Sequence, residues 1–163
     1  MIRKILITLA VGLIIIQFFQ IDKTSNTDQS NHLNTKFPVP EDVGLLLKNA
    51  CYNCHSNSVQ FPWYSSIQPI GWWLNHHIEE GRGELNFSNF TAGPIARQNH
   101  KFEEIIEVVK EKEMPLPSYT WLGLHPEAKL TDSDRANITM WAQMQLDLIA
   151  RQYPADSLKR KKR

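Results

Sequence analysis

The sequence predicts an all-α protein, in which about four helices form one bundle behind an apolar N-terminal helix. Apolar residues recur three and four positions apart in several segments, which is the spacing of a helix with one buried face. No stretch alternates apolar and polar residues for long enough to indicate a strand. The length of 163 residues suits one domain, and an apolar content of 42% with five tryptophans provides for a core and excludes a disordered chain.

The N-terminal segment predicts a membrane anchor. Arg3 and Lys4 precede an apolar run from Ile5 to Phe19, which is the pattern of a secretory signal or a signal anchor. The residues that follow lack the small side chains that a signal peptidase requires, so we expect an uncleaved anchor over residues 1–20. The alternative, a buried helix of a globular domain, is disfavoured because the run is apolar on all sides.

The rest of the chain divides into three parts. Residues 21–37 are polar and without periodicity, and they predict a flexible tether. Residues 38–153 form the expected helical domain, and residues 154–163 form a tail that either frays in solvent or contacts anionic lipid. Five of the 18 basic residues stand at positions 159–163 and all 17 acidic residues precede them, so the domain is acidic although the formal net charge is +1. This balance excludes a uniformly basic nucleic-acid-binding protein, and we expect no nucleic-acid partner.

The first two helices of the domain are expected in its N-terminal half. One begins at Pro40, whose fixed φ suits a first helical turn. The other covers about residues 71–80 and is expected to end at Gly81 and Gly83. The positions on the apolar face of the first helix are Val43, Leu46, Leu47, Ala50, Cys51 and Cys54.

Two further helices are expected in the C-terminal half. The third has its apolar face at Phe102, Ile105, Ile106 and Val109. The fourth follows Thr131, a good N-cap residue with Asp134 three positions on. The positions along one side of this helix are Ile138, Trp141, Ala142, Leu148 and Ile149.

The chemistry of the chain is concentrated in Cys51-Tyr52-Asn53-Cys54-His55. Cys-x-x-Cys-His is the attachment sequence for c-type haem. Residues three and four apart share a helix face, so both thiols can reach the vinyl groups along one porphyrin edge while His55 turns its imidazole toward the iron. We therefore expect one haem c, attached covalently through Cys51 and Cys54, with His55 as a metal ligand.

Three other roles are open to the two cysteines. A zinc ribbon needs a second ligand pair, and the chain has no further cysteine. A thioredoxin-like redox pair lies between a strand and a helix, which this sequence lacks. A structural disulfide is possible outside the cytosol, but it gives no reason for a histidine directly after Cys54.

The second axial ligand of the iron is expected to be Met114. Prolines at 115 and 117 hold its loop in an extended geometry, which would present the thioether rigidly. Met140 and Met144 lie within the fourth helix, where methionine commonly fills core gaps. The strongest rival for the ligand position is His125. The remaining histidines are expected in the tether, on the surface or at the haem edge: His32, His76, His77 and His100.

The residues also resemble a family, the bacterial haem-binding domain family of small c-type cytochrome-like proteins. The resemblance covers about residues 38–150 and implies an exported, often membrane-tethered protein with one haem and a cytochrome c-like helical fold. Gly123 departs from the pattern, since a bulkier residue is expected there. The segments that carry the resemblance are Asn49–Asn57, Phe61–Tyr64, Pro69, Trp72, Trp73, Glu80-Gly81, Leu85–Ser88, Met114-Pro115, Tyr119 and His125–Thr131.

Three residues outside the motif are predicted to complete the haem site. We expect the backbone carbonyl of Pro69 to accept a hydrogen bond from Nδ1 of His55 and thereby orient its ring. Trp72 and Tyr119 belong to an aromatic cluster expected to line the haem crevice and to donate N–H or O–H hydrogen bonds to the propionates. Without a haem, such residues would simply form a core.

The function expected from these residues is electron transfer by a membrane-tethered monohaem cytochrome with a redox partner protein, on the periplasmic side of the bacterial inner membrane. We expect a carrier rather than an enzyme. The alternatives are a peroxidase-like haem enzyme and a haem-based sensor of a small molecule, each with an open sixth position at the iron.

Overall fold

The computed structural model describes residues 1–24 and 28–159, and within them every regular element is helical. The all-α prediction is confirmed. The main helices are α1 (Ile2–Ile16), α2 (Glu41–Ala50), α3 (Tyr52–His55), α4 (Ile70–Glu84), α5 (Ile95–Lys110), α6 (Pro117–Thr120) and α7 (Asp132–Gln152). Short 3-10 turns connect them: η1 (Leu33–Thr35), η2 (Trp63–Ser66), η3 (Phe87–Ala92), η4 (Trp121–Gly123), η5 (Pro126–Ala128) and η6 (Ala155–Leu158).

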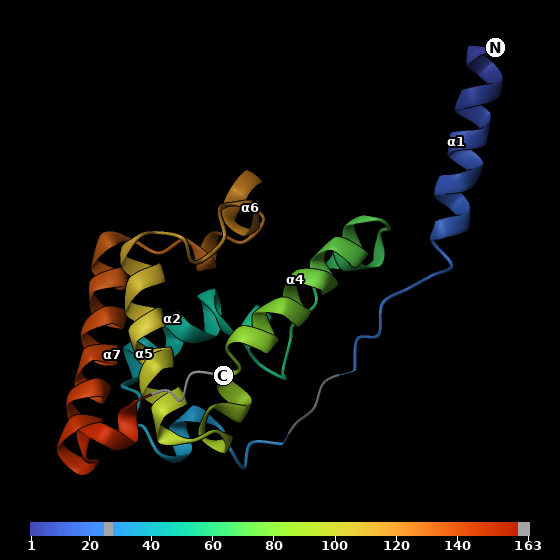
Figure 1. Cartoon of the computed structure of the whole chain (residues 1–163). Helices are drawn as coiled ribbons and strands as arrows, with labels where there is room; N and C mark the ends of the chain where they lie inside the picture. The colour runs from blue at the N-terminus through green and yellow to red at the C-terminus, as the bar shows by residue number, and fades with distance from the viewer. Residues whose placement is uncertain (25–27, 160–163) are drawn as a thin grey trace.

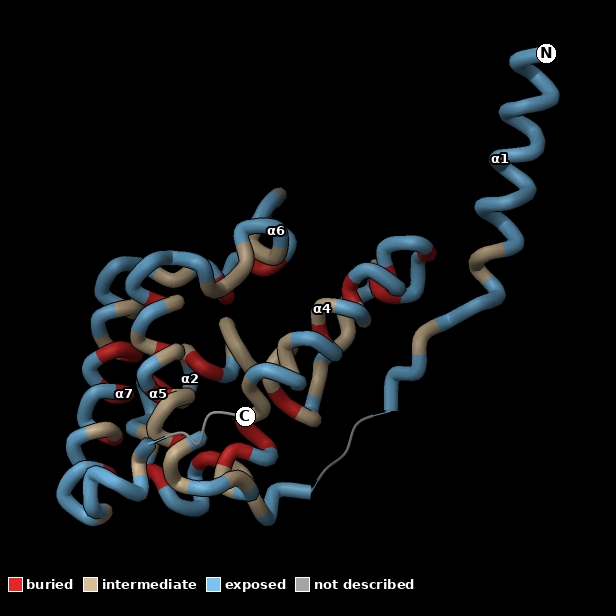
Figure 2. The backbone as a smooth tube through the Cα atoms, viewed as in Figure 1, coloured by how far each residue is buried: buried red, intermediate tan, exposed pale blue. Residues whose placement is uncertain are grey.

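Helices α5 and α7 form the centre of the bundle. They run side by side in opposite directions, with α2 packed against α7 (Figure 1). The apolar spacing predicted for both helices is confirmed at Phe102, Ile138 and Trp141, which are almost fully buried where the helices meet. It is wrong at Leu148, which is 39% exposed on α7. Figure 2 shows the buried positions on the inward faces of these helices.

The start of α7 follows its predicted cap. The Thr131 hydroxyl accepts a hydrogen bond from the Asp134 backbone N–H at 3.1 Å, and the Asp134 carboxylate accepts one from the Thr131 N–H at 2.8 Å. This reciprocal capping box satisfies backbone donors that the first turn of a helix leaves unpaired. It is local in sequence, which is why the sequence predicts it.

The helical core begins earlier than the predicted boundary at residue 38. Leu33 and Phe37, within the segment predicted as a tether, are buried in the main core. The Trp141 indole N–H donates to the Pro38 carbonyl at 3.0 Å and holds this segment against α7. Isolated apolar residues in a polar stretch carry no periodicity, so sequence spacing did not identify them as core.

The two chain ends differ in how they meet the bundle. Helix α1 has no buried residue, and Figure 1 shows it standing away from the other helices. In the described part of the chain, no helix is both long enough and apolar enough to cross a membrane. At the other end, η6 packs on α5, with Leu158 against the core. The rest of the predicted basic tail, residues 160–163, lies outside the described residues.

Candidate functional site

A cavity of about 950 Å³ lies between the Cys-x-x-Cys-His segment, α4, α5 and the loop from α5 to α6. Its size is near the upper end of the roughly 300–1,000 Å³ of small-molecule and cofactor sites. Cys51, Cys54 and His55 line one part of it, and Met114 and Tyr119 also line it. The structure therefore places the cysteine motif and the loop that carries Met114 and Tyr119, which are about 60 residues apart in the sequence, around one cavity.

The cysteine motif is shaped by a break between two helices. Sequence spacing predicted one continuous helix from Pro40 through Cys54, but α2 ends at Ala50 and Cys51 has a φ of −124°. A new short helix, α3, then begins, and the backbone N–H groups of Cys54 and His55 both donate to the Cys51 carbonyl at 3.1 and 2.9 Å. This tight turn brings both sulfurs and the imidazole to the same cavity.

The two cysteines are free and partly buried. Burial raises the pKa of the Cys51 thiol to about 12, and burial also raises the pKa of the Cys54 thiol. Both sulfurs are therefore neutral thiols at physiological pH. Over residues 1–24 and 28–159, no three His, Cys, Asp or Glu side chains converge in a way that could hold a metal ion.

His55 is oriented by two backbone carbonyls of α4. Its Nδ1 lies 2.8 Å from the Gly81 oxygen and 3.0 Å from the Leu85 oxygen. Since both partners are acceptors, Nδ1 carries the proton and the lone pair is on Nε2. Burial lowers the pKa of His55 and outweighs the two backbone hydrogen bonds, which act in the opposite direction, so the neutral imidazole is favoured. A neutral imidazole with Nδ1–H held by a carbonyl is the form that ligates a metal.

Gly81 allows the close approach of α4 to the motif. A Cβ at this position would stand 3.2 Å from the Cys54 carbonyl oxygen and 3.3 Å from Cε1 of His55. The sequence predicted that Gly81 and Gly83 end the helix, but α4 continues to Glu84. The physical reason for glycine at 81 is the space that His55 occupies.

Two predicted site residues take other roles. The Pro69 carbonyl accepts from the Trp73 backbone N–H at 3.2 Å, and His55 uses Gly81 and Leu85 in its place. Trp72 does not line the cavity, and its indole N–H donates to the Phe19 carbonyl at 2.8 Å. Its neighbour Trp73 lines the cavity instead. Adjacent residues of a helix point in directions about 100° apart, so the aromatic cluster could be identified from sequence but its inward member could not.

Met114 lines the cavity from a loop held by α7. The backbone N–H groups of Glu113 and Met114 both donate to the Val108 carbonyl, at 3.0 and 3.2 Å. From α7, the Arg135 guanidinium donates to the Val109 carbonyl at 2.9 Å and to the Met114 carbonyl at 2.7 Å. The loop is thus held by its own helix and by Arg135, a residue that sequence analysis missed. An arginine on a helix face is ordinarily a solvent residue, so no local signal identified it.

His125, the predicted rival of Met114, is engaged at both ring nitrogens. Its Nε2 lies 2.7 Å from the Tyr64 hydroxyl and its Nδ1 lies 3.3 Å from a Glu127 carboxylate oxygen. The ring stacks on Tyr119 with centroids 4.0 Å apart and does not line the cavity. This arrangement favours Met114 over His125 as the cavity-facing ligand.

Tyr119 is tied to the cysteine motif itself. The Asn53 side-chain amide donates to the Tyr119 hydroxyl at 3.0 Å, and the Asn53 oxygen accepts from the Gln60 backbone N–H at 3.1 Å. Asn53 stands between the two cysteines, so the loop from α5 to α7 is linked to the motif. Gly123 in this loop has a φ of +67°, a conformation that favours glycine and explains its departure from the family pattern.

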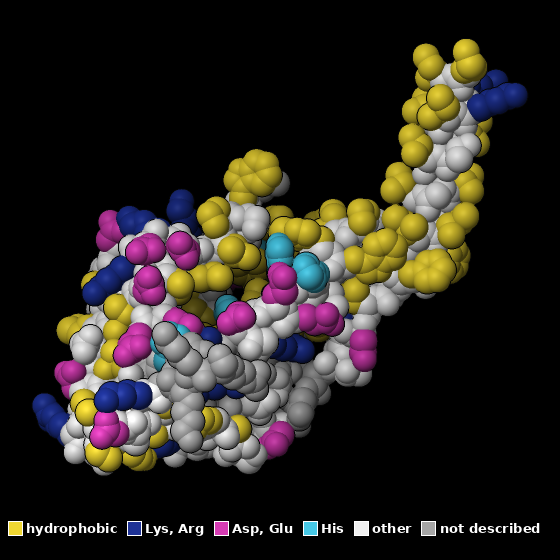
Figure 3. Space-filling model, viewed as in Figure 1, with side chains coloured by type: hydrophobic (Ala, Val, Ile, Leu, Met, Phe, Trp, Pro, Cys, Tyr) yellow, Lys and Arg dark blue, Asp and Glu magenta, His cyan; other side chains and the backbone are white. Residues whose placement is uncertain are grey.

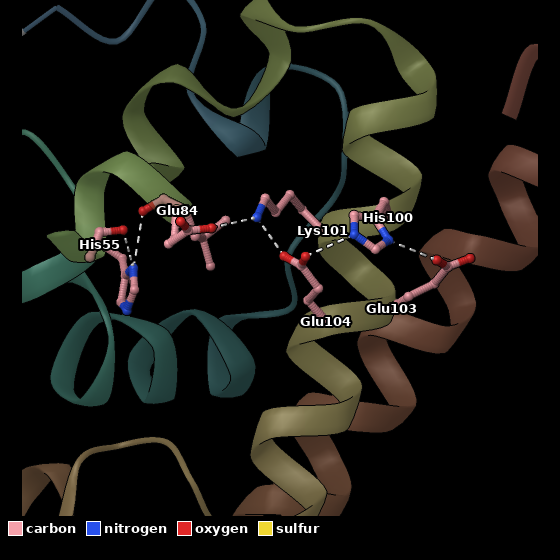
Figure 4. A network of polar contacts seen from close by, with 8 residues as sticks. His55, Glu84, His100, Lys101, Glu103 and Glu104 are labelled. Carbon is pink, nitrogen blue, oxygen red and sulfur yellow. Dashed lines mark hydrogen bonds and ion pairs between the residues drawn. The ribbon is translucent and has the colours of Figure 1, made fainter. Parts of the chain in front are cut away.

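A chain of charged side chains joins α4 to α5 beside the cavity (Figure 4). Lys101 lies between Glu84, at 3.5 Å, and Glu104. His100 continues the chain, with Nε2 2.8 Å from Glu104 and Nδ1 3.3 Å from Glu103. Further glutamates line the cavity, and Figure 3 shows acidic side chains gathered on this face. The domain, which its composition predicts to be acidic, therefore has acidic side chains around the cavity.

Fold and site together define an all-helical protein with a Cys-x-x-Cys-His motif and a ligand-ready histidine on the wall of a cofactor-sized cavity. The model of a family described as haem-binding domain matches residues 11–144, and the chain belongs to this family. The chain is also 27% identical over 106 residues to the cytochrome c peroxidase Ccp of Escherichia coli, an alignment covering 63% of this chain and 22% of that protein. The chain thus spans about a fifth of that relative's length. No solved structure matches it.

The residues present fit a haem. The cavity has the volume for a large planar cofactor, His55 presents an unpaired Nε2, and the two thiols border the same space. Apolar side chains such as Leu85, Phe87 and Ile105 are also among its walls. An apolar lining with a few placed polar groups is the usual character of cofactor sites.

Proposed function

We propose that the chain binds one haem covalently through Cys51 and Cys54, with His55 as axial ligand, and transfers electrons as a membrane-tethered, cytochrome c-like protein. The observation that carries this proposal is the orientation of His55, whose Nδ1–H is held by two carbonyls while both thiols border the same cavity. When bound, haem supplies an iron that exchanges one electron. The protein would attach the haem through its thiols, hold the His55 imidazole in place and exclude water from the cavity with its apolar side chains.

The test of attachment is intact mass. The full chain is produced in a host with the c-type maturation machinery, beside a Cys51→Ser/Cys54→Ser variant and a Ser58→Ala control. We expect the wild type and the control to gain the mass of one haem that persists after denaturation, and the double variant to lack it. A wild-type mass without haem would refute the proposal.

Met114 is proposed as the second axial ligand. Its loop borders the cavity and is held by Arg135, whereas both nitrogens of His125 have other partners. Methionine with histidine raises the reduction potential relative to two histidines. The ferric wild type is expected to show the weak far-red sulfur-to-iron band and a low-spin spectrum. Met114→Ala should lose the band and Met140→Ala, at an exposed position, should retain it.

A peroxidase-like enzyme is a second candidate, favoured by the similarity to the Escherichia coli cytochrome c peroxidase. The buried His125 contacts both cavity-lining tyrosines, Tyr64 through a hydrogen bond and Tyr119 through ring stacking, and would serve as the acid–base group of such an enzyme. Rapid binding of cyanide by the ferric wild type, together with turnover of hydrogen peroxide, would favour this candidate. Slow binding that becomes fast only in Met114→Ala would favour electron transfer.

The location and the partner belong to the same proposal. The basic, apolar N-terminus is the pattern of an export signal anchor, and c-type attachment takes place after export, so we place the domain on the periplasmic side of the inner membrane. An electron carrier requires a redox partner. The glutamates that line the cavity favour a partner with a basic surface, and the rate of electron exchange should then fall as salt is added.

A further inference from the structure

A patch of large apolar side chains is exposed on the corner where η2 leads into α4. We call it the aromatic patch. Its members are Trp63 (73% exposed), Ile67, Ile70, Trp72 and Trp73, the last four each between 40% and 46% exposed. Figure 3 shows apolar side chains continuing over this corner toward α1. A contiguous apolar surface of this kind marks a contact with another apolar body rather than with water.

The chain around the aromatic patch carries no charge. No Asp, Glu, Lys or Arg occurs from Asn49 to Ile78, although these residues make up 21% of the whole sequence. The acidic residues that surround the cavity come from the end of α4 and from α5 onward. The charges that reach this corner come from outside this stretch: the Lys23 ammonium donates to the Ser66 hydroxyl at 2.6 Å, and Glu80, at the edge of the acidic face, lies 3.5 Å from the His77 ring beside Trp73.

The end of α1 is hydrogen-bonded to this same corner. The Gln17 side chain pairs with the Gln68 backbone, donating to its carbonyl at 3.0 Å and accepting from its N–H at 2.9 Å. The Trp72 indole donates to the Phe19 carbonyl, and the Gln20 amide donates to the Ser66 carbonyl at 3.3 Å. Three successive links fix where the apolar helix leaves the domain, so the aromatic patch lies beside its exit.

We propose that the aromatic patch rests on the lipid surface into which α1 inserts, so that the domain sits on the membrane in one orientation. The proposal rests on the membrane attachment proposed above. Tryptophan concentrates at the boundary between lipid and water, where its ring is buried and its N–H stays hydrated. A lipid surface accounts for the apolar character, for the lack of Asp and Glu between residues 49 and 78 and for the adjacent apolar helix together. Trp73 also lines the cavity, so one wall of the haem site would face the membrane.

The proposal is tested by lipid photo-crosslinking of the haem-loaded full chain. The chain is reconstituted in phosphatidylcholine–phosphatidylglycerol vesicles that contain phosphatidylcholine with a diazirine near its headgroup, and the adducts are mapped by mass spectrometry. Residues 61–73 should carry about tenfold more adduct than residues 140–148, as expected for interfacial contact. The latter segment is a matched control, because Met140, Met144 and Leu148 are also exposed and apolar.

A variant then separates the patch from the helix. Trp63→Gln/Ile67→Gln/Ile70→Gln should lose most adducts at 61–73 while α1 remains labelled, and Met140→Gln/Met144→Gln should change neither. Equal labelling of residues 61–73 and 140–148 in a chain with haem and a labelled α1 would overturn this inference and leave the proposed function intact. A protein–protein cross-link between two copies of residues 61–73 would also overturn it. Absence of label on α1 would refute the membrane attachment itself.

Discussion

The bundle of α2, α5 and α7 and the region around the cavity are held together by different forces. The bundle is closed by side chains such as Phe102, Ile138 and Trp141, which bury one another almost completely. The walls of the cavity are instead positioned by polar contacts to backbone carbonyls, from His55, Arg82 and Arg135. Most of the bundle core is packed without the cofactor, whereas the cavity walls have apolar surfaces that no other side chain covers. A haem would complete the packing of the second region and would touch the first where Ile105 and Ile138 belong to both.

The largest expected effect comes from withholding the haem. In Cys51→Ser/Cys54→Ser, covalent haem should be absent, and amide hydrogens of α3, α4 and the loop at residues 111–121 should exchange much faster than in the wild type. Those of α5 and α7 should keep most of their protection, because core residues such as Phe102, Trp141 and Ile149 do not line the cavity. Hydrogen exchange read by mass spectrometry measures both regions in one sample. Equal loss of protection in both would show that the comparison is wrong.

The second largest effect is expected from the bundle core. Phe102→Ala removes a fully buried ring and should lower the free energy of unfolding by about 3–5 kcal/mol. Leu45→Ala, at an exposed position on α2, should change it by less than about 0.5 kcal/mol. Denaturant titration of the haem-loaded chain measures both. A small effect of Phe102→Ala would mean that the bundle is not the main source of stability.

A smaller effect, with a distinct signature, is expected at the contact between the two regions. Arg135→Ala leaves the Val109 and Met114 carbonyls without their side-chain donor, at a cost of about 1–3 kcal/mol. It should also weaken the sulfur-to-iron band, because the Met114 loop loses its support from α7. Arg135→Lys should restore the band in part, and Arg151→Ala, at an exposed site on the same helix, should leave it unchanged. An undiminished band in Arg135→Ala would exclude a positioning role.

The smallest effect is expected at the cap of α7. Thr131→Ala removes one side of the capping box and should lower the free energy of unfolding by about 1 kcal/mol. Its neighbour Ser133, exposed in the first turn, provides the control, and Ser133→Ala should be close to neutral. The spectrum of the haem should be the same in both variants. A spectral change in Thr131→Ala would show that the two regions are more strongly coupled than their contacts suggest.

How well the sequence predicts a feature depends on how far apart in the chain the interacting residues lie. The Thr131–Asp134 cap and the buried face of α5 depend on residues within one or two helical turns, and both are confirmed. The Cys-x-x-Cys-His motif is equally local. The hydrogen bonds at Gly81, Leu85 and Arg135 join segments more than 20 residues apart, and each of them ends on a backbone carbonyl. Every residue has such a carbonyl, so the residue types do not indicate which one is used. For the same reason Pro69 was assigned a role that belongs to Gly81 and Leu85.

The acceptors that orient His55 are main-chain oxygens, and this has a consequence for sequence drift. Every residue type at position 85 supplies the same carbonyl, so this support survives exchange of the Leu85 side chain. Of the two acceptor positions, 81 is the more constrained, because a methyl group there would stand 3.3 Å from Cε1 of His55, closer than an ordinary van der Waals contact. The side chain at position 85 can therefore change in related chains while the imidazole keeps its angle, as long as position 81 leaves room for the ring.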